Sequence, residues 1–195
     1  MKKHASNSEG GSKGKRPHWS MGLLNCMADP KMKVKEDDLI VAITDGYPKA
    51  HYHYLILPKE DINTIYDLKR EHEDLLTHME NIAEDLIKNH PDHEFKFGYH
   101  AKPSMQRLHL HVISLDFDSP YLKTKHHWNS FTTDIFCPAK EVHEELRRNG
   151  FVKRMTVEEY QKLLNTELKC HKCSERSKNM PGLKRHLRSH ISSKD

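Results

Sequence analysis

No segment of the sequence reaches the about 18 consecutive apolar residues that a membrane-spanning helix needs. The N-terminal segment MKKHASNSEGGSKGKRPHWS lacks the apolar stretch of a secretory signal. Cysteine is also scarce, because four residues in a chain of 195 are too few for a disulfide framework. These absences argue against a membrane protein and against a disulfide-stapled secreted protein. We expect a soluble protein in a reducing, intracellular compartment.

Charge is unevenly distributed along the chain. Residues 1–19 have a net charge of +4 and residues 169–195 of +6, so the overall +4 leaves −6 for the segment between them. Basic ends around an acidic middle predict that the ends, rather than the whole surface, contact a polyanion. For the N-terminal segment a solvated tail is an equal alternative. Its KGKR sequence is compatible with a nuclear import signal, and we expect a nuclear protein.

The spacing of apolar residues predicts an α+β fold. Strands are expected over four segments: 38–45, 51–58, 93–100 and 107–114. Helices are expected over 18–29, over 67–90, over 139–149 and from the capping box at Thr156. A turn-rich segment predicts a hairpin between the first two strands, and a long loop should span 115–136. The order strand, strand, helix, strand, strand favours an antiparallel sheet with a helix across it.

Three parts are expected along the chain. They are a disordered basic tail over residues 1–16, a domain with the N-terminal helix over 17–150, and a linker helix with a metal-binding finger over 151–195.

The C-terminal part holds two cysteines and two histidines at the spacing of a zinc finger. The candidate ligands are Cys170, Cys173, His186 and His190. Two thiolates and two imidazoles on one helix face can surround a tetrahedral Zn²⁺. Leu183 stands at the core leucine position of a C2H2 finger, but Ser177 replaces the usual core aromatic residue. We predict a structural zinc ion, and a finger whose small core is completed by packing against the rest of the chain.

The finger helix is basic but lacks a set of residues that read bases. The base-contacting positions of a C2H2 finger fall on Asn179, Gly182 and Arg185, and the central glycine has no side chain for a base. Four basic residues suit phosphate contacts, which position a protein on DNA without selecting a sequence: Lys178, Lys184, Arg185 and Arg188. The finger is therefore predicted to bind DNA without selecting a sequence.

Histidines recur in the segment RLHLHVIS, residues 107–114. Since alternate side chains of a strand share a face, Arg107, His109 and His111 should point into one cleft while the leucines between them enter the core. Candidate metal ligands on neighbouring segments are His51, His53 and His100. Arg107 and Lys49 would oppose a second cation, which favours chemistry on an anion. The alternative is an exposed strand that carries histidines by chance, in a chain with 17 of them.

This segment resembles the motif His-φ-His-φ-His-φ-φ of the histidine-triad (HIT) family of nucleotide hydrolases and transferases, where φ is apolar. His109 aligns with the middle histidine and His111 with the last, while Arg107 replaces the first. The segments DGYPKAHYHYLILP, GYHAKPSMQ, DFDSP and HWNSF and the finger extend the likeness to the aprataxin branch of this family, over about residues 17–190. The resemblance implies a HIT-like antiparallel sheet with helices, fused to a small C2H2-type zinc finger. The resemblance does not extend to the forkhead-associated domain of vertebrate members of this branch, so docking to phosphorylated repair scaffolds is not expected.

The resemblance also implies an activity, that of a DNA 5′-adenylate hydrolase that releases AMP from abortive ligation products through an AMP–histidine intermediate. His109 would be the nucleophile, His111 would hold the phosphate oxygens, His100 would assist the departing 5′-phosphate, and His53 would add a donor. Matching contact positions for nucleotide and DNA are Asp45, Tyr47, Lys49, Ser104, Met105 and His126. Trp19 would wedge against the exposed base step at a nick, where stacking contributes about 1–3 kcal/mol. An ordinary core Trp is the alternative.

Two rival functions remain open. A HIT hydrolase could act on free dinucleoside polyphosphates or AMP-lysine, although such small substrates need neither a finger nor basic ends. A non-catalytic adaptor could bind nicked DNA through an inactive pocket, which Arg107 in place of a histidine would support.

For the preferred function we expect a monomer. Its partner would be nicked or broken DNA with a 5′-adenylate, and it would not bind a membrane. Trp128 and Phe131 would either anchor a loop or contact the substrate, and Cys26 and Cys137 would be packed or free thiols.

Overall fold

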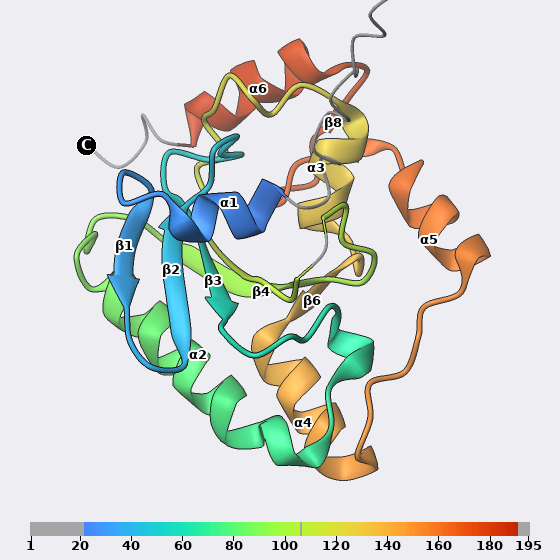
Figure 1. Ribbon diagram of the computed structural model, residues 1–195. Coiled ribbons are helices and arrows are strands. Elements are labelled where there is room, and N and C mark those ends of the chain that lie inside the picture. Colours follow the sequence, from blue (N-terminus) through green and yellow to red (C-terminus); the bar gives the residue numbers. More distant parts are fainter. Residues whose placement is uncertain (1–21, 106, 191–195) are drawn as a thin grey trace, which may run out of the picture.

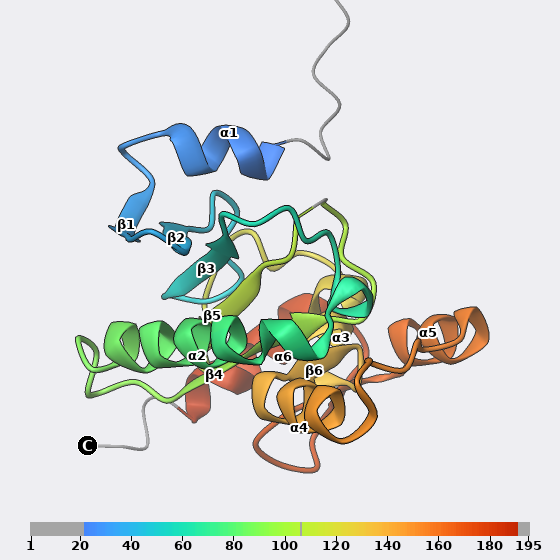
Figure 2. The same ribbon diagram turned by 60° about the horizontal axis from the view of Figure 1, so that its bottom comes forward.

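The computed structural model describes residues 22–105 and 107–190. Within these ranges a six-stranded antiparallel sheet has the order β1-β2-β3-β5-β4-β6, with helices on both faces (Figure 1, Figure 2). Its strands are β1 (Lys33–Glu36), β2 (Ile40–Thr44), β3 (His53–Pro58), β4 (Phe95–His100), β5 (Leu110–Ser114) and β6 (Phe136–Pro138). The predicted α+β fold with an antiparallel sheet is confirmed. No helix of the described ranges is long and apolar enough to cross a membrane. Trp19 and the predicted tail lie outside the described residues.

The predicted hairpin is present and sets the register of the sheet. Strand β2 pairs with β3 from Ile40 opposite Pro58 to Thr44 opposite Tyr54. Strand β3 then pairs with β5, which places His53 opposite Ile113 and Leu55 opposite His111. This pairing brings two histidine-bearing segments together that are more than 50 residues apart in the chain.

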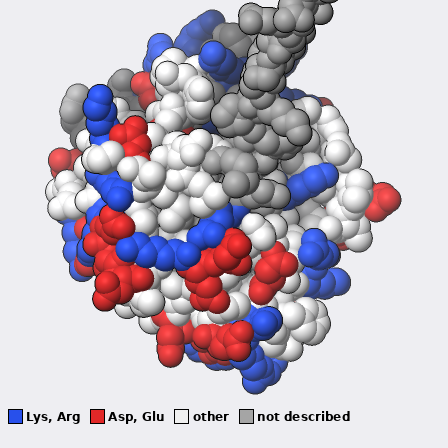
Figure 3. Space-filling view, viewed as in Figure 1, with Lys and Arg blue, Asp and Glu red and all other residues white. Residues whose placement is uncertain are grey.

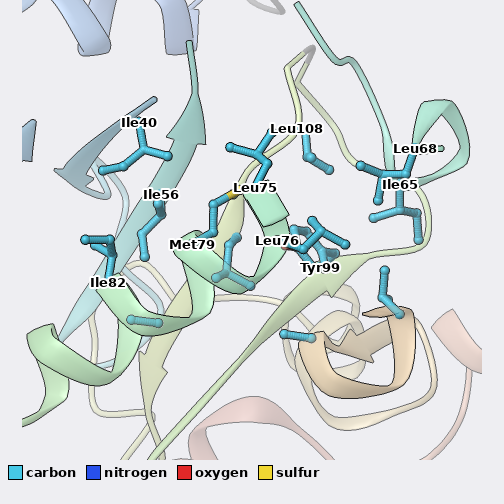
Figure 4. Close-up of a cluster of buried hydrophobic side chains, with 14 of the residues drawn as sticks. Ile40, Ile56, Ile65, Leu68, Leu75, Leu76, Met79, Ile82, Tyr99 and Leu108 are labelled. Atoms are coloured by element: carbon cyan, nitrogen blue, oxygen red, sulfur yellow. The ribbon is translucent and has the colours of Figure 1, made fainter. Parts of the chain in front are cut away.

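Helices α2 (Glu73–Ile87) and α4 (Ala139–Asn149) cover one face of the sheet and lie toward the viewer in Figure 2. Alternate strand residues enter the core that these helices bury, and the apolar side of α2 meets them (Figure 4). Its fully buried members include Ile40, Ile56, Leu76, Met79 and Leu110. Each such side chain contributes about 1.5–3 kcal/mol by leaving water, so this core holds most of the sheet in place.

The opposite face carries two separate apolar clusters. One lies under α1 (Gly22–Ala28) and joins Leu23 to strands β2 and β3. The other lies under α3 (Lys125–Thr132) and the C-terminal finger, and joins Phe117, Trp128 and Phe131 to finger residues. The sheet surface between the two clusters is therefore left for polar side chains.

The finger is built on the second cluster. It consists of β7 (Leu168–Lys169), β8 (Arg176–Ser177) and α6 (Met180–Ser189), and α5 (Val157–Leu164) leads into it. Leu168, Leu183 and Leu187 pack in the same cluster as Trp128, whose Nε1–H donates to the carbonyl of Lys169 at 3.0 Å. The prediction that the finger completes its core on the rest of the chain is confirmed. The predicted domain boundaries at residues 16 and 150 stay predictions.

Several predicted elements differ from the observed ones. The helix predicted over 67–90 is shorter, because Leu68 is extended (ψ 143°) and two short 3-10 turns, Ile65–Asp67 and Arg70–His72, precede α2. The predicted loop over 115–136 contains helix α3, which begins where the Thr124 side chain accepts from the His127 N–H. Strand β1 has no alternating pattern, since it reads KVKE and is mostly exposed, so its sequence carried no signal.

The two faces also differ in charge. Helix α2 carries five acidic residues and no Lys or Arg, whereas α6 carries three Lys/Arg and no acidic residue. In Figure 3 acidic and basic side chains are interspersed over the lower half of the view, where α2 and α4 lie. A polyanion would therefore meet repulsion at α2 and attraction at the finger.

Candidate active site and zinc finger

Four histidines lie together on the face of the sheet that α2 and α4 leave uncovered. His53 begins β3, His100 ends β4, His111 lies in β5, and His109 directly precedes β5. The ring centroid of His111 is 4.4 Å from that of His100, 4.7 Å from His109 and 5.2 Å from His53. The predicted alternation holds from residue 108 to 112, since Leu108, Leu110 and Val112 belong to the core on the other face.

His109 is held in one orientation by the backbone of Arg107. Its Nδ1 lies 2.7 Å from the Arg107 carbonyl oxygen, and its side chain is almost completely buried. Because a carbonyl can only accept, Nδ1 carries the ring proton and Nε2 keeps a free lone pair. This is the tautomer that a nucleophilic nitrogen requires.

His53 and His111 form a chain of hydrogen bonds with defined proton positions. The backbone N–H of Lys49 donates to His53 Nδ1 at 3.2 Å, so neutral His53 carries its proton on Nε2. That Nε2 is 3.0 Å from His111 Nδ1, which must accept, so neutral His111 carries its proton on Nε2. The Nε2 atoms of His111 and His100 are buried and have no partner. The chain thus aims an N–H donor from His111 into the site.

Burial keeps these imidazoles neutral. It lowers the pKa of His53 to about 4, although the Asp45 carboxylate, 3.3 Å from Nδ1, opposes the shift. Burial, and then the charges of His109 and His53, lowers the pKa of His100 to about 3. Burial also lowers the pKa of His109, and lowers that of His111 well below its usual range. Neutral imidazoles can serve as nucleophile and as N–H donors near pH 7 without prior loss of a proton.

Phe131 and Lys96 complete the wall behind the histidines. The Phe131 ring centroid is 4.6 Å from that of His100, 5.4 Å from His111 and 5.5 Å from His53. The Lys96 ammonium donates to the Phe131 carbonyl and lies 4.6 Å from the centre of the Phe136 ring. Burial lowers the pKa of Lys96 to about 8. Lys96 was missed in the sequence, although FKFGYH places it on the same strand face as His100.

Two of the predicted contact residues lie directly at the histidines. Asp45 faces His53, and its Oδ1 accepts from the Tyr47 N–H at 2.7 Å. Lys49 donates its backbone N–H to His53, while burial lowers the pKa of its side chain. Tyr47 is 69% exposed and packs edge-on against Tyr121 at 5.4 Å.

The other predicted contacts lie farther out. Ser104 is exposed in the segment between β4 and β5, Met105 packs with the cluster under α1, and His126 is exposed on α3. On α6, Lys184 donates to the Ser119 carbonyl at 2.7 Å, which joins the finger to the rest of the chain. Arg185 is exposed, and Arg188 lies 3.9 Å from Asp118.

The prediction that Arg107 continues the strand beside His109 is wrong. Strand β5 begins at Leu110, and Arg107 has a positive φ of 82°. Its guanidinium instead reaches the segment after β3, where it pairs with Asp61 at 2.7 Å. The left-handed residue ends the strand geometry, so the alternation predicted from residue 107 onward begins only at residue 108.

The four predicted metal ligands converge in the finger. The sulfur and Nε2 atoms of Cys170, Cys173, His186 and His190 all lie within 4.8 Å of one another. Cys170 Sγ is 3.4 Å from His190 Nε2, and Cys173 Sγ is 3.1 Å from His186 Nε2. Two soft sulfur and two imidazole donors at these separations fit a tetrahedral ion such as Zn²⁺.

Residues 18–127 match the protein family described as scavenger mRNA decapping enzyme C-term binding, which is more than half of the chain. The chain belongs to this family. Residues 132–193 match a second family, the C2HE / C2H2 / C2HC zinc-binding finger. The Cys2His2 cluster therefore lies in a finger of a zinc-binding family.

Comparison with individual proteins confirms the resemblance to aprataxins. The chain is 48% identical to "Aprataxin" of Danio rerio over 179 residues, covering 90% of this chain and 55% of that protein. It is 50% identical to "Aprataxin" of Ciona intestinalis, covering 88% of this chain and 46% of that protein. It thus spans about half the length of these relatives. The crystal structure of the aprataxin ortholog Hnt3 in complex with DNA superposes on this chain with a TM-score of 0.70 at 24% sequence identity. The superposition covers 89% of this chain and 93% of that one, so the two chains share the HIT-like fold.

Proposed function

We propose that the protein is a DNA 5′-adenylate hydrolase, which releases AMP from abortive ligation products at strand breaks. The observation that carries this proposal is the pair of nitrogens at the histidine site. His109 offers a free Nε2 lone pair, and neighbouring His111 offers an unpartnered Nε2–H. A nucleophile beside a donor suits attack on a phosphorus atom whose oxygens gain charge.

The proposed reaction has two steps. His109 Nε2 attacks the α-phosphorus of the adenylate, the P–N bond forms, and the bond to the 5′-phosphate of the DNA breaks. His111 donates to the non-bridging oxygens during this step. His100 donates toward the departing phosphate, and the negative charge of that phosphate would raise the pKa of His100 on binding. Water then attacks the phosphorus of the AMP–His109 adduct, a P–O bond forms, and the P–N bond breaks with its electron pair returning to Nε2. AMP leaves, the proton lost by the water passes to solvent, and neutral His109 with its proton on Nδ1 is restored.

DNA is the proposed partner because the basic finger adjoins the histidine face, while acidic α2 lies on the other one. The similarity to aprataxins, and the DNA complex of one of their orthologs, support the same partner. Lys49, Arg185 and Arg188 would contact phosphates, and Trp19 an exposed base step. Asp45, Tyr47, Ser104, Met105 and His126 would line the path of the nucleotide and DNA.

A structural zinc ion is part of the proposal. Cys170, Cys173, His186 and His190 would hold it, and it would stabilise the finger on its hydrophobic cluster without taking part in the reaction. We further propose that the protein acts as a monomer in the nucleus. Imaging of a fluorescent fusion and light scattering of the purified chain test these two points.

Single-turnover release of AMP from a nicked duplex with a 5′-adenylate tests the function. The wild type should release AMP, and His109→Ala should abolish both release and the acid-labile AMP–protein adduct. His78→Ala is the matched control, because His78 lies on α2 and pairs with Asp37 away from the site. Faster action on diadenosine tetraphosphate than on DNA would favour the small-nucleotide rival. Tight nick binding without turnover would favour the adaptor.

A further inference from the structure

Arg107 stands where the HIT motif has its first histidine, and its backbone controls the neighbouring nucleophile candidate. Its φ of 82° lies in the left-handed region that residues other than glycine seldom adopt. In this conformation its carbonyl oxygen lies 2.7 Å from His109 Nδ1. The backbone conformation of Arg107 therefore determines which nitrogen of His109 faces the substrate side.

The Arg107 side chain is anchored to the segment that follows β3. Its Nη2 donates to the carbonyls of Pro58 at 3.1 Å and Lys59 at 2.8 Å, and its Nη1 pairs with Asp61 at 2.7 Å. The arginine side chain is only 11% exposed, although that of Asp61 is 81% exposed. A planar guanidinium with five N–H groups can serve three acceptors at once, which an imidazole ring with its two nitrogens cannot do.

We propose that Arg107 is a positioning residue for His109. Its guanidinium anchors the left-handed turn to residues 58–61, so that its carbonyl holds His109 with the Nε2 lone pair directed at the substrate. The inference rests on the proposed function. It gives Arg107 a role in catalysis, whereas the adaptor hypothesis took the replacement of the first histidine by Arg107 as a sign of an inactive pocket.

Direct contact with the substrate is the competing role for this side chain. Arg107 also lines a hollow beside His100 and His109, and its Nε is buried without a partner. The two roles make different predictions. A substrate contact acts mainly on DNA binding and is indifferent to Asp61, whereas an anchor acts on the rate at saturation and depends on Asp61.

The first test measures formation of the AMP–protein adduct at saturating adenylated DNA, together with the Kd for that DNA. Arg107→Met should slow adduct formation by about tenfold with little change in Kd, because a misdirected nucleophile reacts slowly once bound. Asp61→Ala should slow it by a smaller factor, and the double variant should be no slower than Arg107→Met. Arg147→Met, which breaks an arginine–Glu73 pair on the helix-covered face, is the matched control and should react as the wild type does. A weaker Kd with an unchanged saturating rate in Arg107→Met, and wild-type behaviour of Asp61→Ala, would overturn the proposal.

The second test does not depend on activity. Nitrogen-15 NMR of labelled histidines reports which ring nitrogen of His109 carries the proton, with the signal assigned by His109→Gln. The wild type should show the Nδ1–H tautomer, and Arg107→Met a mixture. An unchanged His109 signal in a variant that circular dichroism shows to be folded would overturn the proposal, and Arg107→Lys and Asp61→Ala serve if Arg107→Met does not fold. If the wild type releases no AMP but the tautomer still depends on Arg107, the positioning role stands and the proposed function fails.

Discussion

Acidification should destabilise the protein through its buried histidines. In the unfolded chain a histidine takes up a proton near pH 6.5, but the pKa is about 4 for folded His53 and about 3 for folded His100. Between these values the unfolded state binds more protons than the folded state, so the free energy of unfolding rises with pH. The stability that depends on neutral imidazoles is complete above about pH 6.5 and is lost as the pH falls toward 4. From pH 7 to pH 5, each of these histidines should remove about 2 kcal/mol.

Guanidinium denaturation followed by circular dichroism at pH 7, 6 and 5 measures this loss. His53→Gln can still accept from Lys49 and donate to His111, so it should fold, and it should lose about 2 kcal/mol less than the wild type over this range. The comparison removes the contribution of the zinc ligands, which is common to both proteins. His126→Gln changes an exposed histidine and should retain the wild-type slope. Equal pH slopes for the wild type and His53→Gln would refute the reasoning.

Three further predictions concern the fold and the finger. Gly98→Ala should lower the free energy of unfolding by about 3 kcal/mol or more, because a Cβ there would lie 2.3 Å from the Cys137 carbonyl oxygen. Gly22→Ala is the control, because a Cβ at that position would have no other atom within 4 Å, and it should leave the Tm measured by calorimetry unchanged. Asn129→Ala should cost about 1–3 kcal/mol in a denaturant titration, because the buried amide donates to the carbonyls of Leu164 at 2.9 Å and Thr166 at 2.7 Å. The exposed Asn165→Ala should have a smaller effect, and equal effects would contradict this assignment. Cys173→Ser should abolish zinc binding in metal analysis and lower the Tm, whereas Cys26→Ser should retain the metal; zinc retention by Cys173→Ser would contradict the ligand set.

Local patterns in the sequence predicted several structural features correctly. The alternation of Leu108, Leu110 and Val112 predicted which side of β5 enters the core, because a strand has a period of two residues whatever it pairs with. The spacing of the four finger ligands predicted their convergence, because two residues between cysteines and a helical turn between histidines fix their local geometry. Ser177 in place of a core aromatic residue predicted that the finger packs on the rest of the chain, and Trp128 supplies that packing.

Other features could not be predicted, because they depend on contacts between distant segments. One missed feature is local instead: the helix expected from residue 67 does not start until Glu73, since Thr64 and Asp67, three residues apart, cap a separate 3-10 turn first. Phe131 lies in a segment expected to be a loop, and only the packing of α3 brings its ring against three histidines. Arg107 lies outside the strand, and its guanidinium pairs with Asp61, which is 46 residues earlier in the chain.

The sequence by itself determined the residues available for chemistry: the His109–His111 pair, the Cys2His2 finger and the basic charge on α6. These follow from spacings of a few residues, which strand and helix geometry convert directly into shared faces. The tertiary structure decided which of the 17 histidines meet, which ring nitrogens carry protons, and how Arg107 holds His109. Those outcomes depend on the order β3-β5-β4 and on backbone groups such as the Lys49 N–H, and long-range pairing of this kind leaves no periodic mark in a single sequence.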